Sequence, residues 1–101
     1  PMSAVLITIG KVAVGGHDAL DQNASGVMPL IEAAAGKVIC RMRPTDTVVG
    51  HDSNRPDLVA AMRFESPDAI RAFLESDGYR RQVPYRDRAF AEIHSYVAID
   101  V

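Results

Sequence analysis

The fold is decided by residues 64–90, which read FESPDAIRAFLESDGYRRQVPYRDRAF. Ser66-Pro67-Asp68 predicts the start of a helix, because serine caps a first turn, proline suits the first helical position and an acid is favoured beside the positive end of the helix dipole. The apolar stripe of this helix consists of Ile70, Phe73 and Leu74. Gly78 predicts its end, and a short helix is expected over Pro84 to Ala91.

Strands are predicted on both sides of this segment. Runs rich in Val, Ile and other apolar residues predict strands at Ala4 to Val14, Lys37 to Val49, Asp57 to Phe64 and Ile93 to Val101. The second and third of these runs are separated by the loop GHDSNRP, so they are expected to pair as a long hairpin.

A further helix is predicted between the first two strands. Asp18 can cap its start, and Gly36 is placed as its C-terminal stop. The apolar positions recur at steps of three or four, at Leu20, Ala24, Val27, Ile31 and Ala34. Pro29 lies inside this pattern and is expected to kink the helix or to divide it into two pieces.

The resulting order is β-α-β-β-α-β, the split arrangement of ferredoxin-like α+β folds, with a four-stranded antiparallel sheet and both helices on one face. The other face of the sheet would expose several strands of Val, Ile and Met. Two copies packed sheet to sheet would cover it, so the sequence predicts a homodimer.

Composition limits the classes of protein to which the chain can belong. Its 101 residues, 48% of them hydrophobic, predict a single domain over residues 1–101. A net charge of −2 argues against nucleic-acid binding, and the apolar runs are too short to cross a membrane. The lone Cys40 allows no internal disulfide and favours a cytoplasmic location. The order Pro1, Met2 predicts that Met2 is the native initiator and Pro1 a tag scar.

Strand alternation indicates which polar groups share a face of the sheet. One face of the last strand holds Ile93, Val97, Ile99 and Val101, and the other holds His94, Tyr96 and Asp100. In the second strand, alternation separates Val38, Cys40 and Met42 from Lys37, Arg41, Arg43 and Thr45.

These polar groups are candidates for a ligand site. If one polar face looks into a pocket, Arg41 or Arg43 could hold a carboxylate or phenolate while His94 or Tyr96 moves a proton. The alternative is a solvated or intersubunit polar face. His17 could reach over the mouth of the site or be a solvated turn residue. No metal-ligand or nucleotide-binding motif is present in the sequence, so no cofactor is expected.

Three segments resemble a known family: MPLIEAAAGKV at 28–38, FESPDAIRAF at 64–73 and SDGYRRQVPYRD at 76–87. On these segments the chain is similar to the domain of unknown function 1330 family, within the dimeric α+β barrel superfamily. The resemblance implies this fold, a dimer, and functional positions at Tyr79 and Arg86. It also implies a small organic ligand, either between helices and sheet or inside the barrel.

Three functions remain open for the chain. The first is a cofactor-independent enzyme acting on a small anionic or aromatic metabolite by isomerisation, cyclisation or oxygenation, with Tyr79 and His94 as catalytic residues. The second is a non-catalytic dimeric module that binds a small ligand or regulates. The third is a tautomerase that uses Pro1 as its base, which would require Pro1 to be native.

Overall fold

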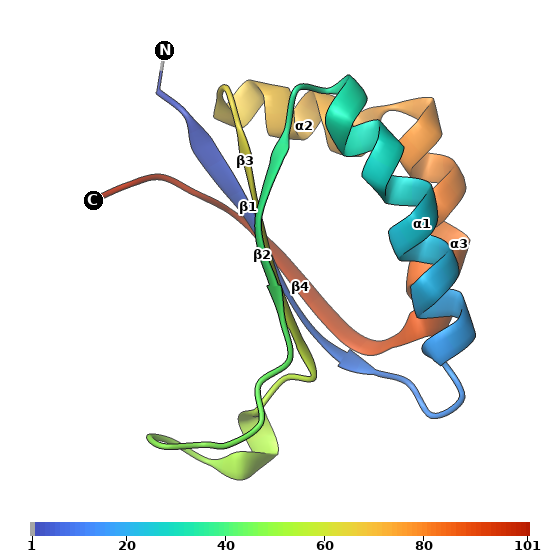
Figure 1. The fold of residues 1–101 in the computed structure, drawn as a ribbon, viewed down its shortest axis with the longest axis vertical. Coiled ribbons are helices and arrows are strands. Elements are labelled where there is room, and N and C mark those ends of the chain that lie inside the picture. The colour runs from blue at the N-terminus through green and yellow to red at the C-terminus, as the bar shows by residue number, and fades with distance from the viewer. Residues whose placement is uncertain (1) are drawn as a thin grey trace.

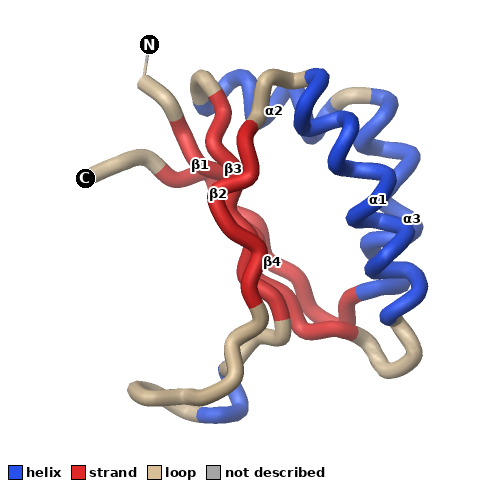
Figure 2. Tube along the Cα trace, in the orientation of Figure 1, coloured by secondary structure: helices blue, strands red, loops and turns tan. Residues whose placement is uncertain are grey.

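The computed structural model describes residues 2–101, which form a four-stranded sheet covered on one face by helices (Figures 1 and 2). The elements are β1 (Ala4–Val12), α1 (His17–Ala33), β2 (Lys37–Met42), a 3-10 turn η1 (Asp52–Asn54), β3 (Leu58–Phe64), α2 (Pro67–Glu75), α3 (Asp77–Ala89) and β4 (Phe90–Ala98). The sheet order is β2-β3-β1-β4 with antiparallel neighbours throughout. The predicted ferredoxin-like α+β fold is confirmed.

The start of α2 follows its sequence signal, but its end does not. The Ala69 amide donates to Ser66 Oγ at 3.1 Å, so Ser66 is the expected cap. The predicted stop at Gly78 is wrong, because Ser76 has an extended backbone and caps a new helix through the Tyr79 amide at 3.2 Å. Gly78 instead lies inside α3, where a Cβ would stand 2.8 Å from Leu30 Cδ2. Its lack of a side chain lets α1 and α3 approach closely.

Two internal prolines are accommodated without ending a helix. Pro29 was expected to kink α1 or to divide it into two pieces, and it does not divide it, because the helix runs from His17 to Ala33. The short helix predicted from Pro84 is likewise wrong at its start, because Pro84 lies in the middle of α3. Both prolines are exposed, so water can satisfy the carbonyl group that each leaves without an intrahelical donor.

The caps of α1 also differ from the prediction. Gly16, not Asp18, is the N-cap, and Asp18 lies in the first turn. At the other end Ala35, not Gly36, adopts the left-handed conformation with φ of 58°. Gly36 is nonetheless required for packing, since a Cβ there would lie 2.9 Å from both Ile31 Cγ2 and Phe64 Cε2.

The strands are shorter than expected at β1 and β2 and shifted at β4. β1 ends at Val12, β2 at Met42, and β4 runs from Phe90 to Ala98. Residues 43–57, predicted in part as strand, form a projecting segment that we call the arm (Figure 1). Its base is fixed to β1, because Asp57 accepts from the Val12 amide at 2.8 Å and donates its own amide to the Gly10 carbonyl at 2.8 Å.

The core is small and lies between the sheet and the helices. Its buried members are Ala4, Leu6, Ile31, Phe64, Ile70 and Phe73. The rings of Phe64 and Phe73 stand 5.2 Å apart, and that of Tyr79 lies 5.2 Å beyond Phe73. The face of the sheet opposite the helices, which we call the open face, has no covering layer within residues 2–101 (Figures 1 and 2).

Candidate functional site

A cavity of about 270 Å³ lies between the sheet and helices α1 and α3. Most of its wall is apolar, with side chains such as Leu20, Val27, Met62 and Phe90. The polar residues that line it are Thr8, Asn23, Arg41, Tyr79, Arg86 and Ser95. An apolar cavity with a few convergent polar groups is the usual form of a small-molecule site.

Tyr79 and Arg86 reach this cavity from one face of α3. They are seven residues apart, which is about two helical turns, so they project in the same direction. The expectation that a bend between two helices would bring them together is wrong, because α3 is continuous through Pro84. Tyr79 is held at the helix start by the Ser76 cap and by packing of its ring against Phe73.

Arg86 is the best-placed cation of the cavity. It is half-buried, and its Nη2 lies 3.2 Å from Asp87 Oδ1. Burial lowers the pKa of Arg86, but its interactions with Tyr79 and then with Asp87 outweigh burial, and the net pKa is raised. The guanidinium group therefore stays charged.

Arg41 enters the cavity because of an irregularity in β2. The register shifts between Val38, which pairs with Met62, and Cys40, which pairs with Ala61. The grouping of Val38 with Cys40 and Met42 on one face is therefore wrong. The shift turns Arg41, which pairs with Ala60, toward the helices, where it lines the cavity as an exposed residue at its rim.

Two further polar groups of the cavity were not identified from the sequence. Thr8 and Ser95 lie on adjacent strands and share a hydrogen bond of 2.9 Å between their hydroxyl groups. Ser95 stands between Ile93 and Val97 on the helix-facing side of β4, so a hydroxyl interrupting an otherwise aliphatic face was the available signal. Asn23 of α1 also lines the cavity, and its Nδ2 donates to the Gln82 carbonyl at 3.4 Å.

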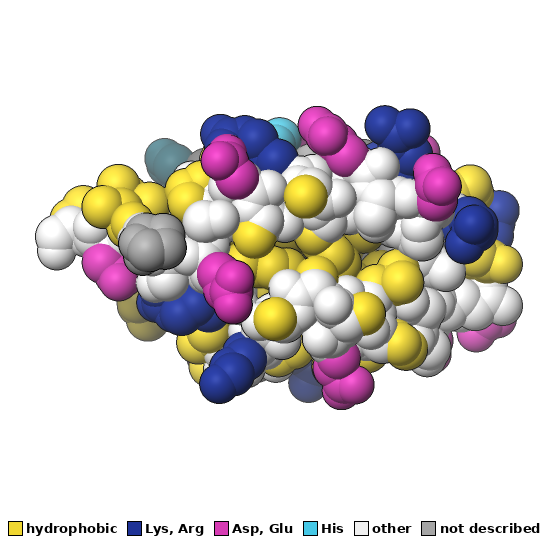
Figure 3. Space-filling view, turned by 90° about the horizontal axis from the view of Figure 1, so that it is seen from above, with side chains coloured by type: hydrophobic (Ala, Val, Ile, Leu, Met, Phe, Trp, Pro, Cys, Tyr) yellow, Lys and Arg dark blue, Asp and Glu magenta, His cyan; other side chains and the backbone are white. Residues whose placement is uncertain are grey.

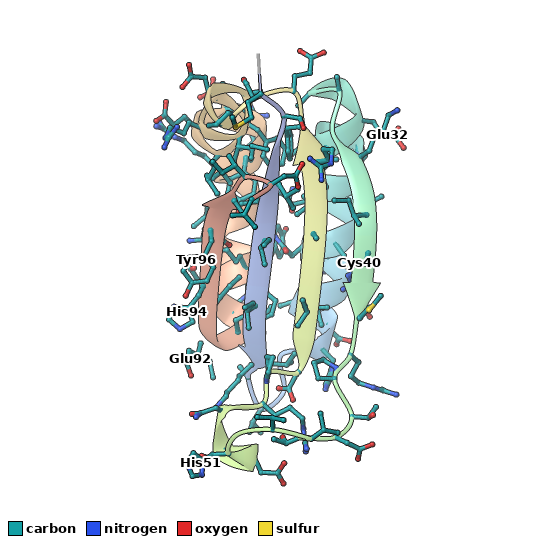
Figure 4. The ribbon with its side chains drawn as sticks, turned by 90° about the vertical axis from the view of Figure 1, so that its left-hand side faces the viewer. Glu32, Cys40, His51, Glu92, His94 and Tyr96 are labelled. Atoms are coloured by element: carbon teal, nitrogen blue, oxygen red, sulfur yellow. The ribbon has the colours of Figure 1, made fainter. Side chains whose placement is uncertain are left out.

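The structure does not bring His94 and Tyr96 to the cavity. Both lie on the open face, where their rings stack at 6.5 Å (Figure 4). His94 Nε2 lies 2.9 Å from Glu92 Oε1, and this contact, followed by the charge of Lys11, holds the pKa of Glu92 below its ordinary value. The sheet therefore separates His94 and Tyr96 from Arg41, against the proposed pairing of a cation with these groups.

Two other candidates also lie outside the cavity lining. Arg43 follows the end of β2 at the base of the arm and is exposed. His17 is the first residue of α1 and is exposed to solvent. Pro1 lies outside the described residues, so its role stays a prediction.

A second hollow lies between the end of α1 and α2, and it carries no charged group. Its lining includes Leu30, Ala33, Ala69 and Ala72. Seen from the end where α2 lies, hydrophobic side chains are visible in a central hollow, and charged side chains gather around its outside (Figure 3).

Among residues 2–101, no three His, Cys, Asp or Glu side chains are grouped as metal ligands. In the same range, no helix is long and apolar enough to cross a membrane.

Solved structures of low sequence identity share this fold. A protein of unknown function from Rhodopseudomonas palustris superposes with a TM-score of 0.87 at 17% identity, covering 99% of this chain and 83% of that one. Hydroxynitrile lyase from Passiflora edulis gives a TM-score of 0.78 at 13% identity over 100% and 95% of the two chains. A dimeric ferredoxin-like protein of unknown function from Jannaschia sp. CCS1 gives 0.69 at 12% identity and covers 100% of both chains.

Sequence comparison identifies the family. No curated protein matches the chain. The family model described as Domain of unknown function (DUF1330) matches residues 7–99, a span that includes Arg41, Tyr79 and Arg86. The chain therefore belongs to the DUF1330 family.

Proposed function

We propose that this protein is an enzyme that moves a proton on a small anionic or aromatic carbonyl compound bound between α1, α3 and the sheet. The observation that carries the proposal is the convergence of Arg86 and Tyr79 in one apolar cavity. Arg86 would hold the negative charge of the ligand, while the phenolate oxygen of Tyr79 would take the proton from carbon, leaving an enolate, and the phenol so formed would return it. The apolar wall would take the hydrocarbon part of the ligand.

The cavity chemistry favours such a reaction for two reasons. A guanidinium group binds a carboxylate through two parallel hydrogen bonds, and it binds more strongly where water is excluded. The same charge stabilises an enolate formed beside the carboxylate. Hydroxynitrile lyase from Passiflora edulis is similar to this chain in fold, so the architecture accommodates lyase chemistry, although fold alone does not assign a reaction.

Binding and chemistry can be tested with matched small molecules. Titration calorimetry should show saturable binding of phenylacetate and much weaker binding of phenylacetamide, which has the same shape but no charge. With phenylpyruvate in D₂O, NMR should show deuterium entering the carbon beside the carbonyl faster with protein than without it. Equal binding of the acid and the amide would overturn the anion site. Preferential binding of the acid without exchange would instead favour the non-catalytic binding module.

We further propose that the enzyme is a homodimer that covers the open face. The chain exposes 6711 Å², about 1,100 Å² more than the roughly 5,600 Å² expected for a compact monomer of its 10.9 kDa mass. A typical stable interface buries about 800 Å² per partner. The excess of exposed surface is therefore large enough for one such interface. The similar protein from Jannaschia sp. CCS1 is a dimer, which supports the same assembly here.

Sedimentation equilibrium is expected to give twice the 10.9 kDa chain mass at micromolar concentration. We expect the interface to bury about 2,000 Å² or more in total, because the exposed aliphatic side chains of β1 and β3 leave water together. A stable monomer at this concentration would refute the dimer and would leave the cavity proposal standing.

A further inference from the structure

The open face is bounded by an apolar projection at each end. At one end stands the arm, residues 43–57, where Val48 and Val49 are each 92% exposed. At the other end lies the tail, residues 99–101, where Ile99 is 53% exposed. Figure 1 shows the arm and the tail projecting to the same side of the sheet, away from the helices. Between them lie the aliphatic residues of β1 and β3 that face away from the helices.

The tail is held across the open face by an ion pair. Asp100 Oδ1 lies 3.6 Å from Arg63 Nη2. Arg63 belongs to β3, whereas the tail follows β4, and β1 lies between these two strands. The two side chains therefore meet over β1. The ion pair directs Asp100 toward its own sheet and leaves the neighbouring Ile99 exposed.

The arm is fixed at its base, and within residues 2–101 no apolar side chain covers the valines near its tip. The Asp57 contacts with β1 hold one end, and Arg55 Nη1 lies 2.8 Å from Asp52 Oδ1 within the arm. In addition, Gly50 adopts a φ of 104°, and it turns the chain directly after Val48 and Val49. Two adjacent valines on a fixed projection form an apolar surface that a partner can cover.

We propose that two copies of this chain seat face to face in opposite directions, so that the arm of each copy packs against the tail of the other. The inference rests on the proposed dimer and adds its orientation and its contact residues. In this arrangement the long projection of one copy meets the short projection of the other at both ends, and the two open faces can approach along their whole length. If the two copies were seated in the same direction, the two arms would meet at one end, and the two short tails would leave a gap at the other end.

Site-directed cross-linking distinguishes these orientations. In a Cys40→Ser background, the double variant Val49→Cys/Ile99→Cys treated with a short bismaleimide should yield a covalent dimer. Each single variant should stay uncross-linked. In the opposite orientation, residue 49 of one copy lies far from residue 49 of the other copy, and the two residues 99 are also far apart. Cross-linking of Val49→Cys alone would show arm against arm and overturn the proposal. A dimer by sedimentation in which no variant cross-links would overturn it as well.

Charge substitution provides an independent measurement. Val48→Asp/Val49→Asp should raise the dimer dissociation constant about a hundredfold, because both side chains would be buried against the partner. The matched control is Val14→Asp, since Val14 is at least as exposed as the arm valines but lies in the turn between β1 and α1. An unchanged dissociation constant in the arm variant would overturn the arm contact. Phenylacetate binding should be retained in both variants, which separates this failure from a failure of the cavity proposal.

Discussion

Replacing Phe73 with alanine is expected to lower the free energy of unfolding by about 3–5 kcal/mol. Phe73 is only 4% exposed, and its ring stands between those of Phe64 and Tyr79 at 5.2 Å from each. It is also part of the cavity wall. Removing it would enlarge an existing void in a core that has few members, so neighbouring side chains could not close the gap.

Urea unfolding of the variant and the wild type at one protein concentration measures this effect, because dimerisation makes stability depend on concentration. Phe73→Leu is the matched control, since it keeps most of the side-chain volume and should cost clearly less. A loss below about 1 kcal/mol for Phe73→Ala would contradict the placement of this ring at the centre of the core.

The element order could be predicted because its signals are local. The Ser66 cap and the Phe73 stripe act within one or two helical turns, and both are present in the structure. The division between α2 and α3 was missed because Ser76 competes with Gly78 as the point where the chain turns, and only the cap on Tyr79 decides it. The continuous course through Pro84 depends on its exposure to water, which is a tertiary property.

For the candidate site, the local pattern of each strand likewise did not predict the properties that depend on the tertiary structure. Alternation correctly put His94 and Tyr96 together, but it could not tell which face the helices would cover. It failed for Arg41, because one register shift beyond Val38 reverses every later residue of β2. Arg86 and Tyr79 were indicated by family resemblance, and their common direction follows from the unbroken α3.

Arg86→Lys is expected to weaken phenylacetate binding about ten- to hundredfold. Lysine keeps the positive charge, but it loses the planar pair of donors that matches a carboxylate. A charge-assisted hydrogen bond contributes roughly 1.5–3 kcal/mol, which corresponds to this change in the dissociation constant. Arg88→Lys is the matched control, because Arg88 lies on the same helix over the Tyr85 ring at 4.9 Å and does not line the cavity. Titration calorimetry measures both variants.

Tyr79→Phe separates binding from chemistry at the same site. The variant keeps the ring that packs on Phe73 and removes only the hydroxyl, so phenylacetate should still bind. Deuterium exchange into phenylpyruvate should fall by at least about a hundredfold if the hydroxyl moves the proton. The contrary result is equally informative: if Arg86→Lys and Tyr79→Phe both bind and exchange as the wild type but melt several degrees lower, the pair stabilises α3 against the sheet. In that case the reacting groups would have to come from the open face, where His94 and Tyr96 lie with Glu92.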